Sequence, residues 1–318
     1  MEQRAEPEGA AKMPDDSGEH TFLRYLEEVR PAVDRRIAGC ISALDPDGAM
    51  DPELVALTGI GKRLRAGVCM LSFDAFSDDP EGLGVALDLS AAIEIAHSAS
   101  LVLDDMLDED EDRRGMPALH MSKGRKKALL EAVGLLSMPY SIAARHGGGY
   151  VDDLARTHRR MVGGALAELD VKPEEMPSRL YDEVISRKTG DMFGLAARFG
   201  SSAAGCPADL VERMGRFGAA AGKAMQIGDD ISDLRTPARS GGPNNASELL
   251  LLRCGGADEV LAKTIHAALR TLDLVGEAPE VPERLSAWMP VLRSSPSEIA
   301  ALMMNEERTD KASHRHIP

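Results

Sequence analysis

The sequence predicts an all-α protein: a single large helical bundle with a central cavity between facing helices. Apolar residues recur at helical spacing through most of the chain. No alternating run of β-branched residues is long enough to indicate a strand. With 318 residues, 43% of them hydrophobic, the chain can bury one large core.

The folded domain is expected to span residues 20–308. Residues 1–19 are rich in Glu, Asp, Pro, Gly and Ala without any periodicity, which predicts a disordered N-terminal segment. Residues 309–318 are polar and are expected to form a flexible tail. We therefore predict one domain between two unstructured ends.

Breaks in the apolar periodicity, many of them at Pro or Gly, divide this domain into helices. Asp51-Pro52 reads as a helix start, because proline suits the first helical position, and Gly147–Gly149 reads as a helix end. A loop is expected over 109–122. Helices are expected over residues 20–44, from 52 onward, within 59–76, and over 81–105, 123–145, 150–171, 178–200, 209–234, 246–255, 257–275, 283–293 and 296–307.

The helix over 81–105 leads into the sequence DDMLD, with Asp104, Asp105 and Asp108. Carboxylates at i, i+1 and i+4 point largely to one side of a helix. Such a cluster is costly unless a cation neutralises it, and clustered oxygen ligands suit Mg²⁺ together with the phosphate oxygens of a substrate. Arg113 and Arg114 follow, with planar guanidinium groups that suit phosphate. This stretch alone is equally compatible with a solvated acidic face.

A second copy of the DDxxD pattern favours the metal site. Asp229, Asp230 and Asp233 repeat the spacing at the end of another apolar helix, 209–234. Two such clusters, each at the end of an apolar helix, indicate two sets of carboxylates that face each other across a cavity.

A basic stretch precedes the first aspartates. Lys62, Arg63 and Arg65 stand at the head of an apolar helix, whose N-terminus carries partial positive charge and free N–H groups, so the stretch is a candidate anion site. A surface basic turn is the alternative for this stretch alone. His97 lies about two helical turns before Asp104 on roughly the same face.

Composition excludes several classes of function. The net charge of −15 makes nucleic acid an improbable partner, so local basic patches must attract anionic substrates. The four cysteines form no CxxC pair, and no signal peptide is evident, which predicts reduced thiols in a cytoplasmic protein. No uninterrupted apolar run is long enough to span a bilayer, so we expect no transmembrane segment.

Taken together, these motifs resemble those of the trans-isoprenyl diphosphate synthases, also called polyprenyl synthetases. The order and rough spacing match over nearly all of residues 20–240. The set is highly specific, although each member alone is not. The motifs are GKRLR at 61–65, His97, DDMLD at 104–108, RRGMP at 113–117, KTG at 188–190 and MQIGDDISD at 225–233.

The resemblance implies a bundle of the isoprenoid synthase type and a prenyltransferase that joins isopentenyl diphosphate to an allylic diphosphate. Mg²⁺, with three ions per active site, would be held by Asp104, Asp105, Asp108, Asp229 and Asp230, with Asp233 as outer support. A homodimer is also implied. The allylic diphosphate would contact Arg113, Lys188, Thr189 and Gln226, and isopentenyl diphosphate would contact Lys62, Arg65, His97 and Arg114.

Product length is expected to depend on the helix before the first aspartates. Ser100 and Ala99, four and five residues before Asp104, are small, so no aromatic side chain blocks a growing prenyl tail there. Tyr140 could form a floor further down. This predicts a C20 product, geranylgeranyl diphosphate, or a longer one.

Several positions depart from the family pattern. Ala132 and Val133 replace a Gly-Asp pair, and Gly164-Ala165 stands where Gly-Gln is usual. A Gly-Lys pair is missing after the second aspartates, where the loop offers only Arg235 and Arg239 as basic groups.

The alternatives are a class I terpene cyclase, a non-catalytic regulatory subunit of a synthase, and a generic acidic helical scaffold. Aromatic residues make up only 3% of the chain, which disfavours a cyclase that steers cations with ring faces. The missing Gly-Lys pair favours a regulatory subunit, whereas two complete aspartate motifs oppose it. A scaffold leaves the paired motifs unexplained.

Overall fold

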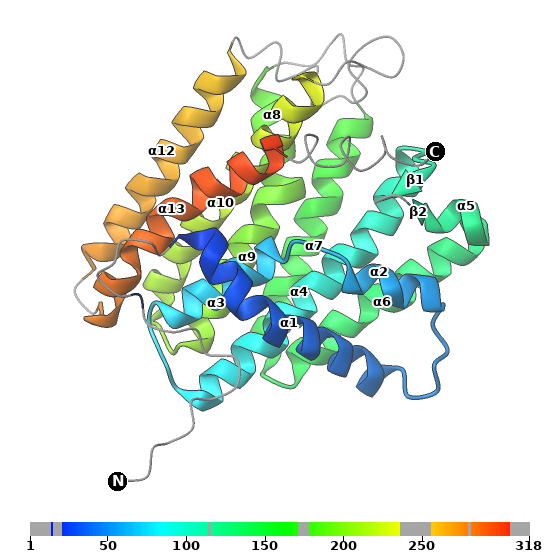
Figure 1. Ribbon diagram of the computed structural model, residues 1–318, viewed down its shortest axis with the longest axis horizontal. Coiled ribbons are helices and arrows are strands. Elements are labelled where there is room, and N and C mark those ends of the chain that lie inside the picture. The colour runs from blue at the N-terminus through cyan, green and yellow to red at the C-terminus, as the bar shows by residue number, and fades with distance from the viewer. Residues whose placement is uncertain are drawn as a thin grey trace, which may run out of the picture.

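The computed structural model describes residues 21–113, 116–170, 178–235, 256–278 and 281–305, together with Pro14. Apart from connecting turns and two very short strands, the described residues form helices, so the predicted all-α fold class is confirmed (Figure 1). The elements are α1 (Phe22–Leu44), α2 (Pro52–Gly59), α3 (Leu64–Asp74), α4 (Pro80–Leu107), β1 (Asp112–Arg113), β2 (Met116–Pro117), α5 (Leu119–Lys123), α6 (Arg125–Ala144), α7 (Gly148–Leu169), α8 (Ser178–Ile185), the π-helical turn η2 (Ser186–Gly190), α9 (Asp191–Ala203), α10 (Ala208–Arg235), α12 (Ala257–Gly276) and α13 (Arg284–Asn305).

Side-chain caps fix where the N-terminal helices begin. Thr21 accepts a hydrogen bond from the backbone N–H of Arg24 at the start of α1. Asp51 and Asp79 cap α2 and α4 in the same way, and each is followed by a proline at the first helical position. These residues satisfy N–H groups that a helix start leaves without an internal partner, so the starts lie close to the predicted ones.

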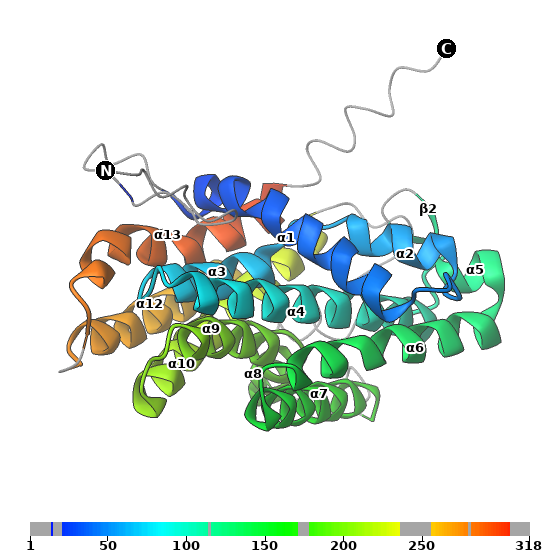
Figure 2. The same ribbon diagram turned by 90° about the horizontal axis from the view of Figure 1, so that it is seen from below.

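Helix α4 is the central helix of the bundle. It packs against α1, α3, α6 and α9, with α1 on one side of it and α6, α7 and α9 on the other (Figure 2). By length and composition it could cross a membrane, but 72% of its most apolar window is buried inside the protein. Its apolar character is therefore accounted for by the core that surrounds it.

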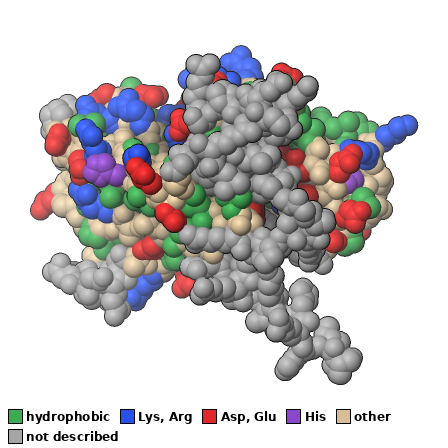
Figure 3. All heavy atoms as spheres, turned by 90° about the horizontal axis from the view of Figure 1, so that it is seen from above, with side chains coloured by type: hydrophobic (Ala, Val, Ile, Leu, Met, Phe, Trp, Pro, Cys, Tyr) green, Lys and Arg blue, Asp and Glu red, His purple; other side chains and the backbone are tan. Residues whose placement is uncertain are grey.

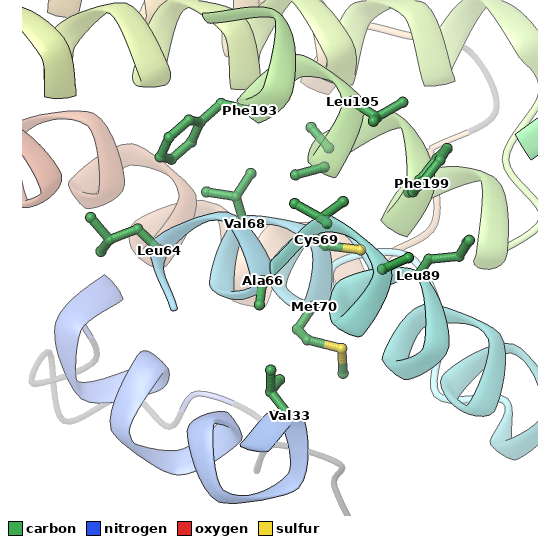
Figure 4. Packing of buried hydrophobic residues seen from close by; sticks show 14 of the residues in the cluster. Val33, Leu64, Ala66, Val68, Cys69, Met70, Leu89, Phe193, Leu195 and Phe199 are labelled. Atoms are coloured by element: carbon green, nitrogen blue, oxygen red, sulfur yellow. The ribbon is translucent and has the colours of Figure 1, made fainter. Parts of the chain in front are cut away.

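Helix α3 fills the space between α1 and α9. Ala66 and Met70 point toward Val33 of α1, while Val68 and Cys69 point toward the α9 side (Figure 4). All of these side chains are at most 1% exposed. Because α3 is apolar on both faces, it fixes the N-terminal helix and the α9–α10 pair in one core.

Several predicted boundaries are wrong. Gly148 and Gly149, read as part of a helix end, begin α7. The expected loop over 109–122 contains the β1–β2 hairpin, which pairs Asp112 with Pro117, and helix α5. The expected helix over 178–200 is interrupted by the π-helical turn η2, and the expected helices 283–293 and 296–307 are one helix, α13. The predicted segments 1–19 (apart from Pro14) and 309–318 and the predicted helix 246–255 lie outside the described residues.

Helix α13 contains Pro290 and Pro296, and at Pro296 a serine hydroxyl replaces the missing donor. Proline has no N–H, so Pro296 cannot bond the carbonyl of Leu292 one turn earlier. The hydroxyl of Ser295 donates to that carbonyl instead, at 2.9 Å. The sequence prediction placed a helix boundary here because it did not count this hydroxyl.

A buried carboxylate in α3 makes stability depend on pH. Asp74 is 2% exposed, and burial raises its pKa to about 7, although the Tyr25 hydroxyl donates to it at 2.7 Å. The folded state therefore holds a proton that the unfolded state releases, and stability falls as pH rises from about 4 to about 7.

Asp74→Asn keeps an acceptor for Tyr25 and removes the charge. We expect its melting temperature to exceed that of the wild type more at about pH 8 than at about pH 5, as measured by calorimetry. An equal difference at both pH values would contradict this assignment.

Candidate active site

Both aspartate motifs stand at C-terminal helix ends. Asp104 and Asp105 lie in the last turn of α4 and Asp108 caps it, while the second motif lies in the last two turns of α10. The C-terminal ends of α4 and α10 lie on the same side of the molecule (Figure 1). Because a helix C-terminus already carries partial negative charge, carboxylates there raise the demand for a cation.

The first motif contains one anchored carboxylate and two that are less tightly held. Asp105 is 3% exposed and accepts two hydrogen bonds from Arg113. One comes from Nε, 2.6 Å from Asp105 Oδ1, and the other from Nη2 of the same guanidinium group. Arg113 also reaches Asp110 at 3.2 Å. Asp104 is half-buried, and burial, with Asp108 and Asp105 nearby, raises its pKa to about 6. The pKa of Asp108 is also raised, mainly by partial burial of its carboxyl group, although the residue as a whole is exposed.

Lys188 approaches this motif from the π-helical turn η2. Its Nζ lies 2.6 Å from Glu168 Oε2. Burial opposes its charge, yet Glu168, Asp104 and Asp108 outweigh burial and raise its pKa. Gly164 allows α7 to come this close, because a Cβ there would lie 2.7 Å from the Arg187 Cβ and 3.3 Å from the Lys188 nitrogen. The departure at Gly164-Ala165 thus retains the glycine on which this packing depends.

The second motif is joined to η2 by a hydrogen-bond network. The Thr189 hydroxyl donates to Gln226 Oε1 at 2.8 Å, and Gln226 Nε2 donates to Asp230 Oδ1 at 3.0 Å. The Tyr181 hydroxyl donates to Asp230 Oδ2 at 2.6 Å. Asp230 is 1% exposed, whereas Asp229 is half-buried and Asp233 is exposed. Tyr181 was missed at the sequence level, because only its contact with a carboxylate 49 residues away reveals a role.

The basic stretch divides into a structural arginine and two candidate ligands. Arg63 is 2% exposed and forms ion pairs with two carboxylates: Nε lies 2.6 Å from Asp34 Oδ1, and Nη1 lies 3.5 Å from Glu94 Oε2. Its charge is therefore neutralised by other residues of the protein. Lys62 Nζ lies 2.9 Å from the Met303 sulfur of α13, and the Arg65 guanidinium lies over the Phe193 ring at 5.1 Å. His97 is half-buried on α4, which packs on the α3 helix of Arg65. Arg114 lies outside the described residues.

The predicted chain-length residues lie in different surroundings. Ala99 is fully buried in the core, whereas Ser100 is half-buried one turn before Asp104. Tyr140 lies between α6 and α7, where its hydroxyl is 2.6 Å from Nδ1 of His158, and it lines a cavity of about 540 Å³.

The described residues offer suitable ligands for a divalent cation, but they do not form a preassembled metal site. Among them, no three His, Cys, Asp or Glu side chains are gathered closely enough to hold a metal ion. The donors are nonetheless all carboxylate oxygens, which suit Mg²⁺. The pKa of Asp104 is raised mainly by burial and further by the neighbouring carboxylates Asp108 and Asp105. A cation supplied together with a diphosphate would stabilise the charged form of Asp104.

Figure 3 shows acidic and basic side chains close to one another at both ends of this face of the molecule.

Comparison with known proteins decides the family. The polyprenyl synthetase family model matches residues 53–247, which include both aspartate motifs and the Lys188–Thr189 pair. The chain belongs to the polyprenyl synthetase family. It is therefore a prenyltransferase of the class that makes linear isoprenyl diphosphates.

Relatives of this polyprenyl synthetase differ in product length. The chain is 30% identical to a short chain isoprenyl diphosphate synthase of Methanothermobacter thermautotrophicus, over 71% of each chain. It is 26% identical to a geranylgeranyl diphosphate synthase of Methanosarcina mazei, over 72% of each chain. It is 29% identical to a farnesyl diphosphate synthase of Geobacillus stearothermophilus, over 80% of this chain and 93% of that one.

Solved structures support the fold of the polyprenyl synthetase. A geranyltranstransferase of Thermotoga maritima superimposes with a TM-score of 0.70 at 21% identity, covering 87% of this chain and 99% of that one. A decaprenyl diphosphate synthase of Rhodobacter capsulatus superimposes with a TM-score of 0.66 at 21% identity, covering 90% of this chain and 98% of that one. These similarities confirm the predicted isoprenoid synthase bundle.

Proposed function

We propose that this protein condenses isopentenyl diphosphate with an allylic diphosphate to give a linear product of C20 or longer. The observation that carries this proposal is the arrangement of two aspartate motifs at two helix C-termini, with Lys188 and Thr189 of η2 linked to both. Such an arrangement suits a substrate that carries a diphosphate.

The hydrogen bonds support a division of labour among the six aspartates. Asp105 is engaged by Arg113, and Asp230 by Tyr181 and Gln226, and both carboxylates are almost fully buried. We assign these two as anchors. The more accessible members, which would hold three Mg²⁺ ions with the substrate, are Asp104, Asp108 and Asp229, with Asp233 as outer support. When bound, the ions neutralise the diphosphate and make it a better leaving group.

The protein side chains then position two diphosphates. Lys188 and Gln226 hold the allylic diphosphate, and Lys62, Arg65 and His97 hold isopentenyl diphosphate, with Arg114 as a further candidate. The allylic C–O bond breaks and the electron pair leaves with the diphosphate. The double bond of isopentenyl diphosphate attacks the allylic cation, and a proton passes to the departing diphosphate. The chain is thereby five carbons longer and one double bond is restored.

Ser100 is the residue that best tests the predicted product length. It shares a face with Asp104, one turn away, and it presents only a small hydroxyl to its half-buried surroundings. Ser100→Phe should therefore shorten the main product by at least one five-carbon unit, read by mass spectrometry, while primer is still consumed. Ala99→Phe places the ring in a fully buried position and should shorten the product only at a cost in stability. An unchanged product distribution in active Ser100→Phe would show that the tail takes another route.

A homodimer would explain an exposed apolar face. Exposed large hydrophobic residues gather on α6 and α7, which pack together: Leu129, Leu130, Val133, Val162, Leu166 and Leu169, each between 45% and 72% exposed. Patches of this kind in soluble proteins mark interaction sites. We assign this face to a second copy of the chain, in a cytoplasmic enzyme.

Leu130, at 72% exposure, should be central to that dimer. Leu130→Glu should convert a dimer to a monomer in light scattering, because a charge would be buried between the two copies. Leu274→Glu, on α12 and 49% exposed, is the matched control and should leave the mass unchanged. A monomeric wild type, or a dimeric Leu130→Glu variant, would refute this interface.

A further inference from the structure

Asp230 of the second motif is held on both of its oxygens. Tyr181 of α8 donates to Oδ2 at 2.6 Å, and Gln226 donates to Oδ1 at 3.0 Å. Asp230 and Tyr181 are each 1% exposed. Two donors, one on each oxygen, fix the orientation of this carboxyl group.

The donated hydrogen bonds of this network converge on Asp230 from two sides. Gln226 gives its amide N–H to Asp230 and accepts the Thr189 hydroxyl on its Oε1. Tyr181 is therefore connected through Asp230 and Gln226 to Thr189, which adjoins Lys188. The adjacent Asp229 points elsewhere, because successive helical residues are rotated by about 100°.

Packing around Tyr181 fixes α8 against α10. Its ring belongs to a small apolar cluster with Ile185 of α8 and Ile227 and Ile231 of α10. Helix α8 continues directly into η2, so a fixed contact at Tyr181 sets where Lys188 and Thr189 stand relative to the second motif.

We propose that Tyr181 is a positioning residue for the metal–diphosphate site. Through Asp230 it holds Asp229 in the orientation that binds metal, and it holds Lys188 and Thr189 toward the diphosphate. This inference rests on the proposed function, since it presumes a metal-bound diphosphate between the two motifs.

The test is a comparison of two tyrosine variants. Tyr181→Phe keeps the ring and removes the hydroxyl. Tyr25→Phe is a matched control, because Tyr25 is also buried and donates to a buried carboxylate, Asp74, at 2.7 Å, in the α1–α3 contact. Both variants lose a buried tyrosine–carboxylate hydrogen bond, so a purely structural role predicts similar losses of melting temperature and no difference between them in metal binding.

The measurement is Mn²⁺ binding by electron paramagnetic resonance in the presence of inorganic diphosphate, with Mn²⁺ in place of Mg²⁺. We expect Tyr181→Phe to weaken Mn²⁺ binding by about tenfold or more, as is typical when a residue that orients a metal ligand is lost, and Tyr25→Phe to bind as the wild type does. Equal affinities in the two variants would overturn the role of Tyr181 while leaving the proposed function intact. A wild-type protein that binds no Mn²⁺ with diphosphate would overturn the proposed function itself, and this inference with it.

Discussion

Replacing Asp104 or Asp229 with asparagine should lower the turnover number by about 100- to 1,000-fold, the usual effect of removing one well-placed electrostatic group from an active site. Each substitution keeps the shape of the side chain and removes one charge from a group assigned to Mg²⁺. Asp104 is half-buried beside two further carboxylates of its motif, and Asp229 is the half-buried member of the other. The measurement is the steady-state rate with saturating Mg²⁺ and both substrates.

A matched control separates this effect from a general loss of acidic charge. Asp209 stands at the opposite end of α10 from Asp229 and is exposed, with Arg213 3.9 Å away. Asp209→Asn should leave the rate within about twofold, since exposed ion pairs contribute little. If Asp104→Asn or Asp229→Asn retained near-normal activity, the metal assignment would be wrong.

Gly200→Ala should give the largest loss of stability among the substitutions considered. A Cβ at this position of α9 would lie 1.9 Å from the carbonyl oxygen of Cys69 and 2.9 Å from the Ser72 Cβ, both on α3. The close neighbours include backbone, so α3 and α9 would have to separate. We expect a loss of about 3 kcal/mol or more in the free energy of unfolding, at the upper end of overpacking effects.

Gly84→Ala is the matched control for that experiment. Gly84 also lies within a helix, α4, but a Cβ there would meet no atom within 4 Å. The change should be neutral or stabilise the protein by up to about 1 kcal/mol, because alanine favours helix. Chemical denaturation of both variants measures the difference. A Gly200→Ala protein as stable as Gly84→Ala would mean that the α3–α9 contact is looser than described.

The main elements of the site could be predicted from sequence because their signals are local. The spacing of Asp104, Asp105 and Asp108 along one helix places all three at its end, and the same holds for the second motif. The helix start at Asp51-Pro52 was visible because cap and proline are adjacent in the chain. The family resemblance added the roles of these residues, and the family itself is confirmed.

What the sequence could not predict depends on contacts between distant residues. Arg63 reads as part of a basic patch until its partners, Asp34 and Glu94, are placed beside it. Tyr181 becomes part of the site only through Asp230. The π-helical turn that carries Lys188 could not be recognised from the apolar pattern. It is a single turn, too short to establish a periodicity of its own, and it only shifts the pattern of the helix by one residue.

The central claim is tested most directly by incubating the purified protein with Mg²⁺, isopentenyl diphosphate and, in turn, the C5, C10 and C15 allylic diphosphates. The products are read by mass spectrometry. The account predicts a linear diphosphate of C20 or longer, formed from at least one of the three primers. Elongation that stops at C15 would contradict the predicted length, and no elongation from any primer, by a folded protein that binds Mg²⁺ and diphosphate, would contradict the synthase function.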